Sequence, residues 1–113
     1  MITVSKKEMS NNDLSYICQQ LSLFMATGLP PADGLALCVP EGGAAKDGIA
    51  RALDSINEGQ TLGEALGSGG FPKLMCAMIS VGEATGSLDG VLDSLASYYA
   101  RMEEARSALA SAV

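Results

Sequence analysis

The segment 88–113 constrains the fold more than any other part of this 113-residue chain. It contains no proline and, after Gly90, no glycine. Its apolar residues recur at alternating spacings of four and three, a rhythm broken only at Arg106: Leu88, Leu92, Leu95, Tyr99, Met102 and Leu109. This pattern predicts one continuous amphipathic helix. Such a helix would be about 39 Å long, whereas a chain of this size has a radius of gyration of about 13 Å. We therefore expect its far end to project beyond the rest of the domain.

Glycines, prolines and capping residues divide the preceding chain into five shorter helices. In the longer ones, apolar residues repeat every three or four positions, which is the spacing of one helix face. Asn12 is the expected N-cap of the first helix, and the Thr61 hydroxyl with Glu64 forms a capping-box pattern before the fourth. We expect these helices at 12–28, from 31 to just before Pro40, and at 44–58, 61–66 and 72–86. Together with the terminal helix they predict an all-α fold, preceded by a flexible leader over residues 1–11.

Charge and composition exclude several functions. The chain has 13 acidic and 7 basic residues, a net charge of −6, and its basic residues form no stripe that could follow a phosphate backbone. We therefore expect no nucleic-acid partner.

Histidine is absent, which removes the commonest general base, so we expect no enzyme activity. Cys18, Cys38 and Cys76 are odd in number and far apart, which predicts buried free thiols and no disulfide or zinc site. We expect no cofactor, and no apolar run has the length of a membrane-spanning helix.

Glu83 breaks a local rule. It lies in the last turn of the fifth predicted helix, where the negative end of the helix dipole disfavours a carboxylate. One interpretation is that its side chain accepts hydrogen bonds from the free amides at the start of the next helix, near Ser87, Leu88 and Asp89. The other is that Glu83, Asp89 and Asp93 form an acidic cluster for a hard cation or a basic partner.

The tripeptide Asp93-Ser94-Leu95 resembles the attachment site of an acyl carrier protein, which is also a small acidic helical domain. In that class the modified serine lies at the exposed start of a helix, whereas Ser94 is expected almost two turns inside one. We therefore favour an exposed helical serine without a carrier function.

Several motifs together resemble one family. Residues 81–88 (VGEATGSL) are similar to the Gly-Glu-x-Ser/Thr-Gly-x-Leu segment of the type II secretion system F domain. This domain is the cytoplasmic module of general secretion pathway protein F and of the type IV pilus inner-membrane platform protein. Residues 21–35 (LSLFMATGLPPADGL), 59–66 (GQTLGEAL) and the pair Phe71-Pro72 resemble other motifs of the family in the same order. The similarity covers about residues 14–106.

The resemblance implies an antiparallel six-helix bundle with a long C-terminal helix, spanning residues 12–113. It also implies that the chain is the N-terminal cytoplasmic copy of this domain in a larger membrane protein. Its implied function is a non-catalytic link between the assembly ATPase and pilin or pseudopilin insertion, at the cytoplasmic face of the bacterial inner membrane. The implied partners are that ATPase and other inner-membrane platform components. Membrane contact would be made only by segments outside this chain. A generic acidic helical interaction module is the alternative.

Two further expectations concern the surface. The apolar stripe of segment 88–113 is longer than a small bundle can cover, which favours a homodimer or higher oligomer. The residues expected to shape the helix corners or contact a partner are those of the glycine-containing motifs: Gly28, Pro30, Gly59, Gly82, Glu83, Gly86, Ser87 and Leu88.

Overall fold

The fold is entirely helical in the part of the chain that the structure describes. A computed structural model describes residues 8–112, and within this range it contains six α-helices and no strand. The helices are α1 (Asn11–Ala26), α2 (Pro31–Leu37), α3 (Gly43–Asn57), α4 (Leu62–Ser68), α5 (Lys73–Thr85) and α6 (Leu88–Ser111). The all-α prediction is thus confirmed, and most predicted boundaries agree within one or two residues.

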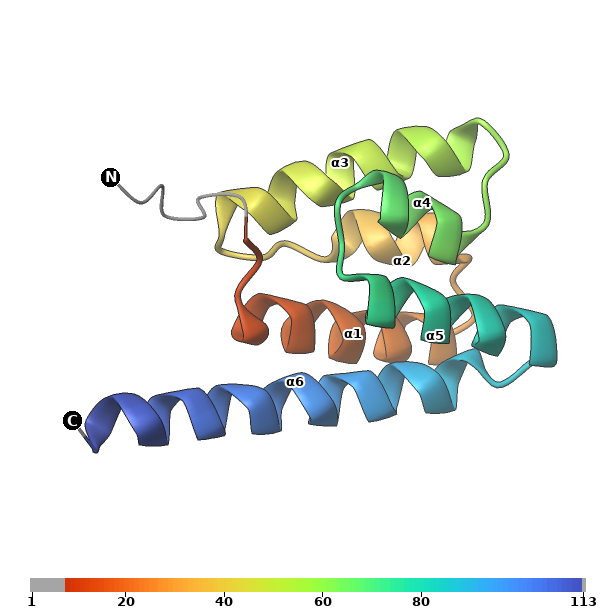
Figure 1. The fold of residues 1–113 in the computed structure, drawn as a ribbon. Helices are drawn as coiled ribbons and strands as arrows, with labels where there is room; N and C mark the ends of the chain where they lie inside the picture. Colours follow the sequence, from red (N-terminus) through yellow and green to blue (C-terminus); the bar gives the residue numbers. More distant parts are fainter. Residues whose placement is uncertain (1–7, 113) are drawn as a thin grey trace.

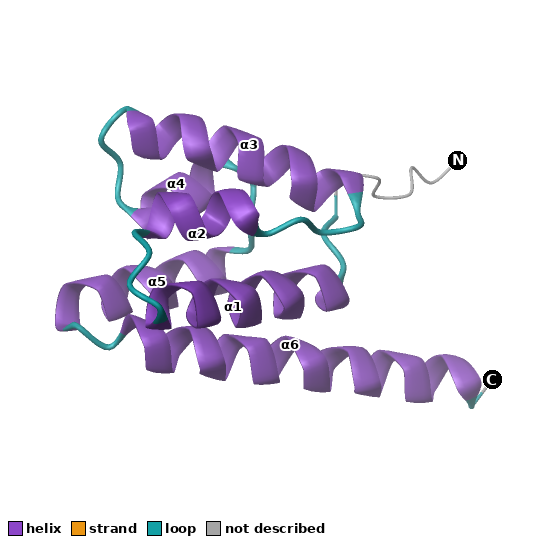
Figure 2. Cartoon of the chain, turned by 180° about the vertical axis from the view of Figure 1, so that it is seen from behind, coloured by secondary structure: helices purple, strands orange, loops and turns teal. Residues whose placement is uncertain are grey.

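Consecutive helices run in alternating directions, so the connections collect at two opposite ends of the molecule (Figure 1). Both views show α2, α3 and α4 in one layer and α1, α5 and α6 in the other (Figure 2). Helices α2 to α5 pack mainly on their neighbours in the sequence, whereas α1 and α6 pack mainly on each other and so close the arrangement. The result is an elongated bundle of 45 × 29 × 22 Å.

The core lies between the two layers and is built from aliphatic side chains, with few aromatic ones. On α1 the buried face consists of Leu14, Ile17, Cys18 and Leu21, which follow the predicted spacing. Met75 and Ile79 of α5 and Leu92 and Leu95 of α6 pack into the same core. The free thiols of Cys18 and Cys38 are buried as predicted, while Cys76 is only half-buried.

Four helices end at a glycine with a positive φ angle. These glycines are Gly28 (94°), Gly59 (101°), Gly70 (85°) and Gly86 (75°). In each case the residue after the glycine donates its N–H to a carbonyl one turn back: Leu29 to Phe24, Gln60 to Ser55, Phe71 to Leu66 and Ser87 to Gly82. This is the Schellman type of helix end, which satisfies carbonyls that would otherwise lack partners.

The terminal helix is continuous, as predicted, and its last turns extend past the start of α1 (Figure 1). Its apolar stripe is buried only at Leu92, Leu95 and Tyr99, whereas Met102 is 45 % exposed and Leu109 72 % exposed. The stripe is therefore used by this bundle along its first half only.

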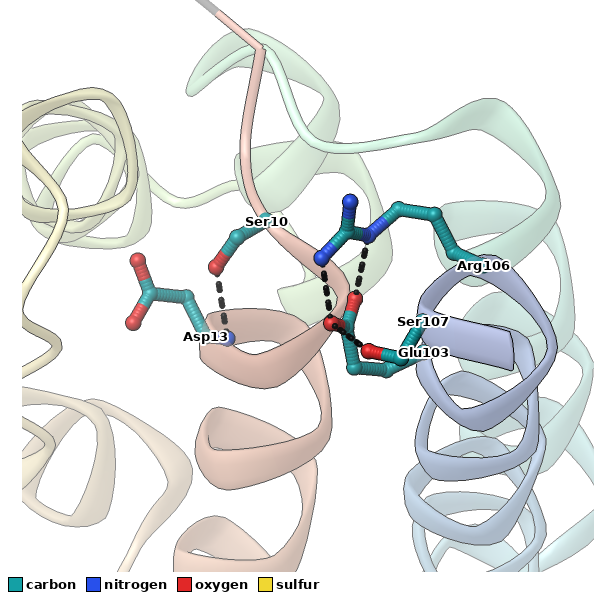
Figure 3. A network of polar contacts seen from close by, with 5 residues as sticks. All are labelled: Ser10, Asp13, Glu103, Arg106 and Ser107. Atoms are coloured by element: carbon teal, nitrogen blue, oxygen red, sulfur yellow. Dashed lines mark hydrogen bonds and ion pairs between the residues drawn. The ribbon is translucent and has the colours of Figure 1, made fainter. Parts of the chain in front are cut away.

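A polar network marks the level at which α6 passes the start of α1 (Figure 3). Arg106 donates two hydrogen bonds to the Glu103 carboxylate, at 2.7 and 2.9 Å, and the Ser107 hydroxyl donates a third. The hydrogen bond from Arg106 is the main reason why the pKa of Glu103 falls to about 2, and the bond from Ser107 acts in the same direction. Glu103 thus holds the Arg106 and Ser107 side chains on α6 beside the start of α1 (Figure 3).

The predicted N-cap of α1, and with it the predicted start of the helix, was wrong by two residues. The helix begins at Asn11, and the Ser10 hydroxyl accepts the N–H of Asp13, so Ser10 is the N-cap in place of Asn12. Both residues are good N-caps, and the local sequence alone does not separate them. Of the predicted leader 1–11, residues 1–7 lie outside the described range.

Candidate functional site

The motif residues singled out in the sequence gather at one end of the bundle. The α1–α2, α3–α4 and α5–α6 connections all lie at this end because consecutive helices alternate in direction (Figure 1). Gly28 and Pro30 belong to the first connection, Gly59 to the second, and Gly86 and Ser87 to the third. We call these three connections with the adjoining helix turns the motif end. The α2–α3 and α4–α5 connections lie at the opposite end, where α6 projects.

The α5–α6 corner depends on two glycines for different reasons. Gly86 has a φ angle of 75°, which L-residues with a side chain rarely adopt. Gly82 is buried where α5 meets α6, and a Cβ atom there would lie 3.0 Å from the Leu88 Cα and from a Val91 methyl. Ser87 precedes α6, but its hydroxyl contacts Thr85 and makes no capping hydrogen bond. The two glycines therefore permit the tight corner.

Glu83 does hold a helix start, but not the one predicted. Its carboxylate accepts the N–H of Leu62 at 2.8 Å and the N–H of Gly63 at 2.9 Å, both in the first turn of α4. The prediction that it binds the amides near Ser87, Leu88 and Asp89 was wrong. The physical reason given was correct, because the positive end of a helix dipole offsets the unfavourable position of the carboxylate on α5. The neighbouring helix that supplies the amides is set by tertiary packing.

Asp13 plays the same part at the opposite end and was missed. Its buried carboxylate accepts the N–H of Gly42 at 2.9 Å and that of Glu41 at 3.3 Å, directly before α3. A signal was present in the sequence, because Asp13 lies four residues before Ile17 on the buried face of α1. An acidic residue on an apolar stripe needs internal partners, since burying an unpaired charge is costly.

A groove of about 750 Å³ opens at the motif end. Its lining comes from the C-terminal half of α1, the start of α2 and the α5–α6 corner. The lining combines predicted motif residues with residues outside the motifs' glycine corners, such as the exposed Leu23. The lining residues are Ser22, Leu23, Met25, Ala26, Pro31, Gly82, Glu83, Gly86, Leu88, Asp89 and Asp93. The groove joins the motifs of residues 21–35 and 81–88 into one surface.

The three carboxylates of the predicted cation cluster line this groove but are not arranged as a metal site. Glu83 is engaged by the α4 amides, and Asp93 accepts the Ser22 hydroxyl at 2.8 Å. Within residues 8–112 no group of three histidine, cysteine, aspartate or glutamate side chains is placed to hold a metal ion. The geometry therefore does not support a cation site at Glu83, Asp89 and Asp93.

The thiols offer no activated nucleophile. Burial raises the pKa of Cys18 to about 12, with a further contribution from Cys38, whose own pKa burial raises to about 11. Burial also raises the pKa of Cys76. Since the thiolate is the reactive form, these side chains behave as small apolar residues near neutral pH. Ser94 is exposed inside α6, away from the helix start where a carrier serine would be expected.

The sequence is similar to known proteins of one family. The family model of type II secretion system (T2SS), protein F matches residues 17–113, so the chain belongs to this family. Among curated proteins it is similar to the type II secretion system protein F of Vibrio cholerae serotype O1, with 32 % identity over 96 % of the chain. It is also similar to the type 4 fimbrial assembly protein PilC of Pseudomonas putida, with 29 % identity over 76 % of the chain.

The chain spans 28 % of the length of the Vibrio protein and 22 % of the Pseudomonas protein. None of the described helices combines the length and the hydrophobicity that crossing a bilayer requires.

Proposed function

We propose that this chain is a non-catalytic cytoplasmic domain of an inner-membrane platform protein for type II secretion or type IV pilus assembly. The observation that carries the proposal is the family match over residues 17–113. The names of the two relatives, a secretion protein and a fimbrial assembly protein, support both settings equally. The thiols with raised pKa values are in keeping with a structural role.

The mechanical part of the proposal rests on α6. This helix runs without interruption from the motif end, past the start of α1, to the opposite end of the bundle (Figures 1 and 2). Its first half is fixed to α1 by packing and by two hydroxyl contacts, from Ser15 to the Ala96 carbonyl and from Ser22 to Asp93. A displacement applied at the motif end would therefore move the projecting turns as one rigid body. In the proposed function, the assembly ATPase acts at the motif end and α6 conveys the displacement toward the membrane.

A homodimer or higher oligomer is part of the same proposal. The exposed Met102 and Leu109 continue the apolar stripe of α6 beyond the bundle and offer a surface for a second copy. Replacing both by serine should shift the sedimentation of a concentrated sample toward the monomer. A strictly monomeric unmodified protein would remove this part of the proposal.

The function is tested with the full-length protein in its host. Deletion of the gene should abolish secretion of exported proteins or surface fimbriae, and the full-length gene should restore it. A version lacking residues 8–112 should be made and inserted but should fail to restore it. Co-purification of the full-length protein with the cytoplasmic assembly ATPase should require the same residues. Normal secretion and fimbriation in the deletion strain would reject the proposed function.

A further inference from the structure

The groove at the motif end has an apolar floor that the bundle leaves uncovered. Leu23 is 56 % exposed, and Met25, Ala26, Pro31 and Leu88 line the same hollow. Leu23 points away from the packed face of α1, which uses Leu21 and Cys18. The Leu23 side chain is therefore not part of the core of this domain.

The charges of the domain are separated along its long axis. Seven carboxylates belong to helix turns at the motif end: Asp33, Asp54, Glu58, Glu64, Glu83, Asp89 and Asp93. Within residues 8–112 no basic residue lies at this end. Lys46 and Lys73 are in the first turns of α3 and α5, and Arg101 and Arg106 are in the distal half of α6. Arg51 reaches toward the opposite end, where it donates to the Gly69 carbonyl at 2.8 Å.

None of these seven carboxylates is neutralised by an ion pair. Across the described residues, the structure contains a single ion pair, between Arg106 and Glu103 at the opposite end. Three of the seven, Glu83, Asp89 and Asp93, line the groove itself. An apolar groove with this acidic lining, at an end without basic residues among those described, repels a second copy of the same end and repels the anionic surfaces of lipid bilayers and nucleic acids. The occupant that complements it is a protein segment in which an apolar side chain is flanked by Lys or Arg.

We propose that the groove lined by Leu23, Leu88 and Asp89 binds a basic amphipathic segment of a partner protein. The apolar side chain of that segment packs on Leu23 and Leu88, and its flanking Lys or Arg side chains face Asp89 and Asp93. This inference deepens the proposed docking role of the motif end and rests on it for its biological setting. The binding itself can be tested on the domain alone.

The probes are three short synthetic peptides. The first is an amphipathic helix with leucines on one face and lysines beside them. The second has glutamate in place of each lysine, and the third has serine in place of each leucine. We expect only the first to bind at about 0.15 M ionic strength, and its affinity should fall as salt is added because exposed charges are then screened. NMR shift changes should be centred on Leu23, Leu88 and Asp89.

Matched variants separate the groove from the net charge. Leu23→Ser should weaken binding about tenfold, since it removes an apolar side chain from the contact. Leu109→Ser should have no effect, although Leu109 is also exposed. Asp89→Lys should weaken binding strongly, whereas Asp47→Lys makes the same change of charge near the start of α3 and should not. Melting temperatures establish that all four variants are folded.

Four results would overturn the inference. The serine-containing peptide could bind as tightly as the first, which would make the attraction purely electrostatic. Leu23→Ser and Leu109→Ser could weaken binding equally, which would place the contact elsewhere. Finally, the first peptide could fail to bind up to millimolar concentration, or anionic vesicles could bind the motif end instead. None of these results depends on secretion or fimbriation in the host, so failure of this inference is distinguishable from failure of the proposed function.

Discussion

A carboxylate at the unfavourable end of one helix is stabilised here by the favourable end of another. The Glu83 carboxylate accepts two backbone N–H groups of α4, from Leu62 and Gly63, and both of these residues are buried. The Thr61 and Glu64 side chains form a capping box at the same helix start. The first turn of α4 thus has local partners supplied by its own sequence and a distant one supplied by α5.

Glu83→Ala should therefore destabilise the domain. The substitution leaves two buried N–H groups without a partner, which costs about 2–3 kcal/mol for hydrogen bonds to a charged acceptor. Urea unfolding monitored by circular dichroism measures the loss. Glu104→Ala is the matched control, because Glu104 is exposed on α6 and its replacement should change stability by less than about 0.5 kcal/mol. Equal stability of the two variants would show that the α4 contact contributes little.

The stability of the domain should fall at alkaline pH, because three buried acidic groups have raised pKa values. Burial raises the pKa of Cys18 to about 12, of Cys38 to about 11 and of Tyr99 to about 12. Below the ordinary thiol value of 9.0 the stabilisation from these protonated groups is complete. Above it the unfolded chain loses protons that the native state retains, so stability falls until the pH reaches the native values.

The Tyr99 part of this effect can be isolated. Tyr99→Phe should make the fall in melting temperature above about pH 10 shallower, because one group with a raised pKa is removed. Tyr16→Phe is the matched control, since Tyr16 is exposed, and it should leave the slope unchanged. Melting temperatures recorded from about pH 8 to 11 test both. A slope that Tyr99→Phe does not alter would exclude a contribution from this side chain.

At the scale of the helices, most boundaries could be predicted because their signals are local. Glycine after a helix and the capping box around Thr61 act within four or five residues, and both occur where expected. Ser10 and Asn12 show the limit of such signals, because two good capping residues stood within one turn. The positions of helix starts relative to carboxylates on other helices were not predictable. Glu83 was assigned to α6 instead of α4 because the sequence does not state which helices become neighbours.

The α5–α6 corner gives a contrasting pair of glycines. A Cβ atom at Gly82 would lie 3.0 Å from the Leu88 Cα, so Gly82→Ala must push the two helices apart and should cost about 1–3 kcal/mol. Gly90 lies in the first turn of α6, and a Cβ atom added there would have open space around it, with nothing within 4 Å. Gly90→Ala should stabilise the domain by about 0.5–1 kcal/mol because alanine favours the helix. Thermal unfolding of both variants is the measurement, and effects of the same sign would contradict the close approach.

At the scale of the whole molecule, the alternating helix directions convert scattered residues into two different ends. Acidic residues that are far apart in the sequence, such as Asp33, Glu58 and Asp89, meet at the motif end because each lies beside the α1–α2, α3–α4 or α5–α6 connection. The net charge of −6 was visible in the sequence, but its position was not. Once the bundle topology is known, this separation follows from the helix boundaries alone.

The continuity of α6 across these two ends leads to the last prediction. Ala105 lies just past Glu103, at the level where α6 leaves α1, and it is exposed. Ala105→Pro removes a backbone hydrogen bond and destabilises the helix locally by about 3 kcal/mol. No core side chain lies beyond this point, so the loss is confined to the projecting turns. The bundle should therefore melt at nearly its original temperature with a broken projecting segment.

In the full-length protein, Ala105→Pro should abolish secretion or fimbriation, whereas Ala105→Ser should retain it. The difference would be measured by exported protein in the medium and by counting fimbriae in electron micrographs, with equal protein levels confirmed in the membrane fraction. If the proline variant assembled fimbriae or secreted normally, α6 could not be acting as a rigid connection. Family membership would stand in that case, and the motif end would have to act through a contact that does not require displacement along the helix.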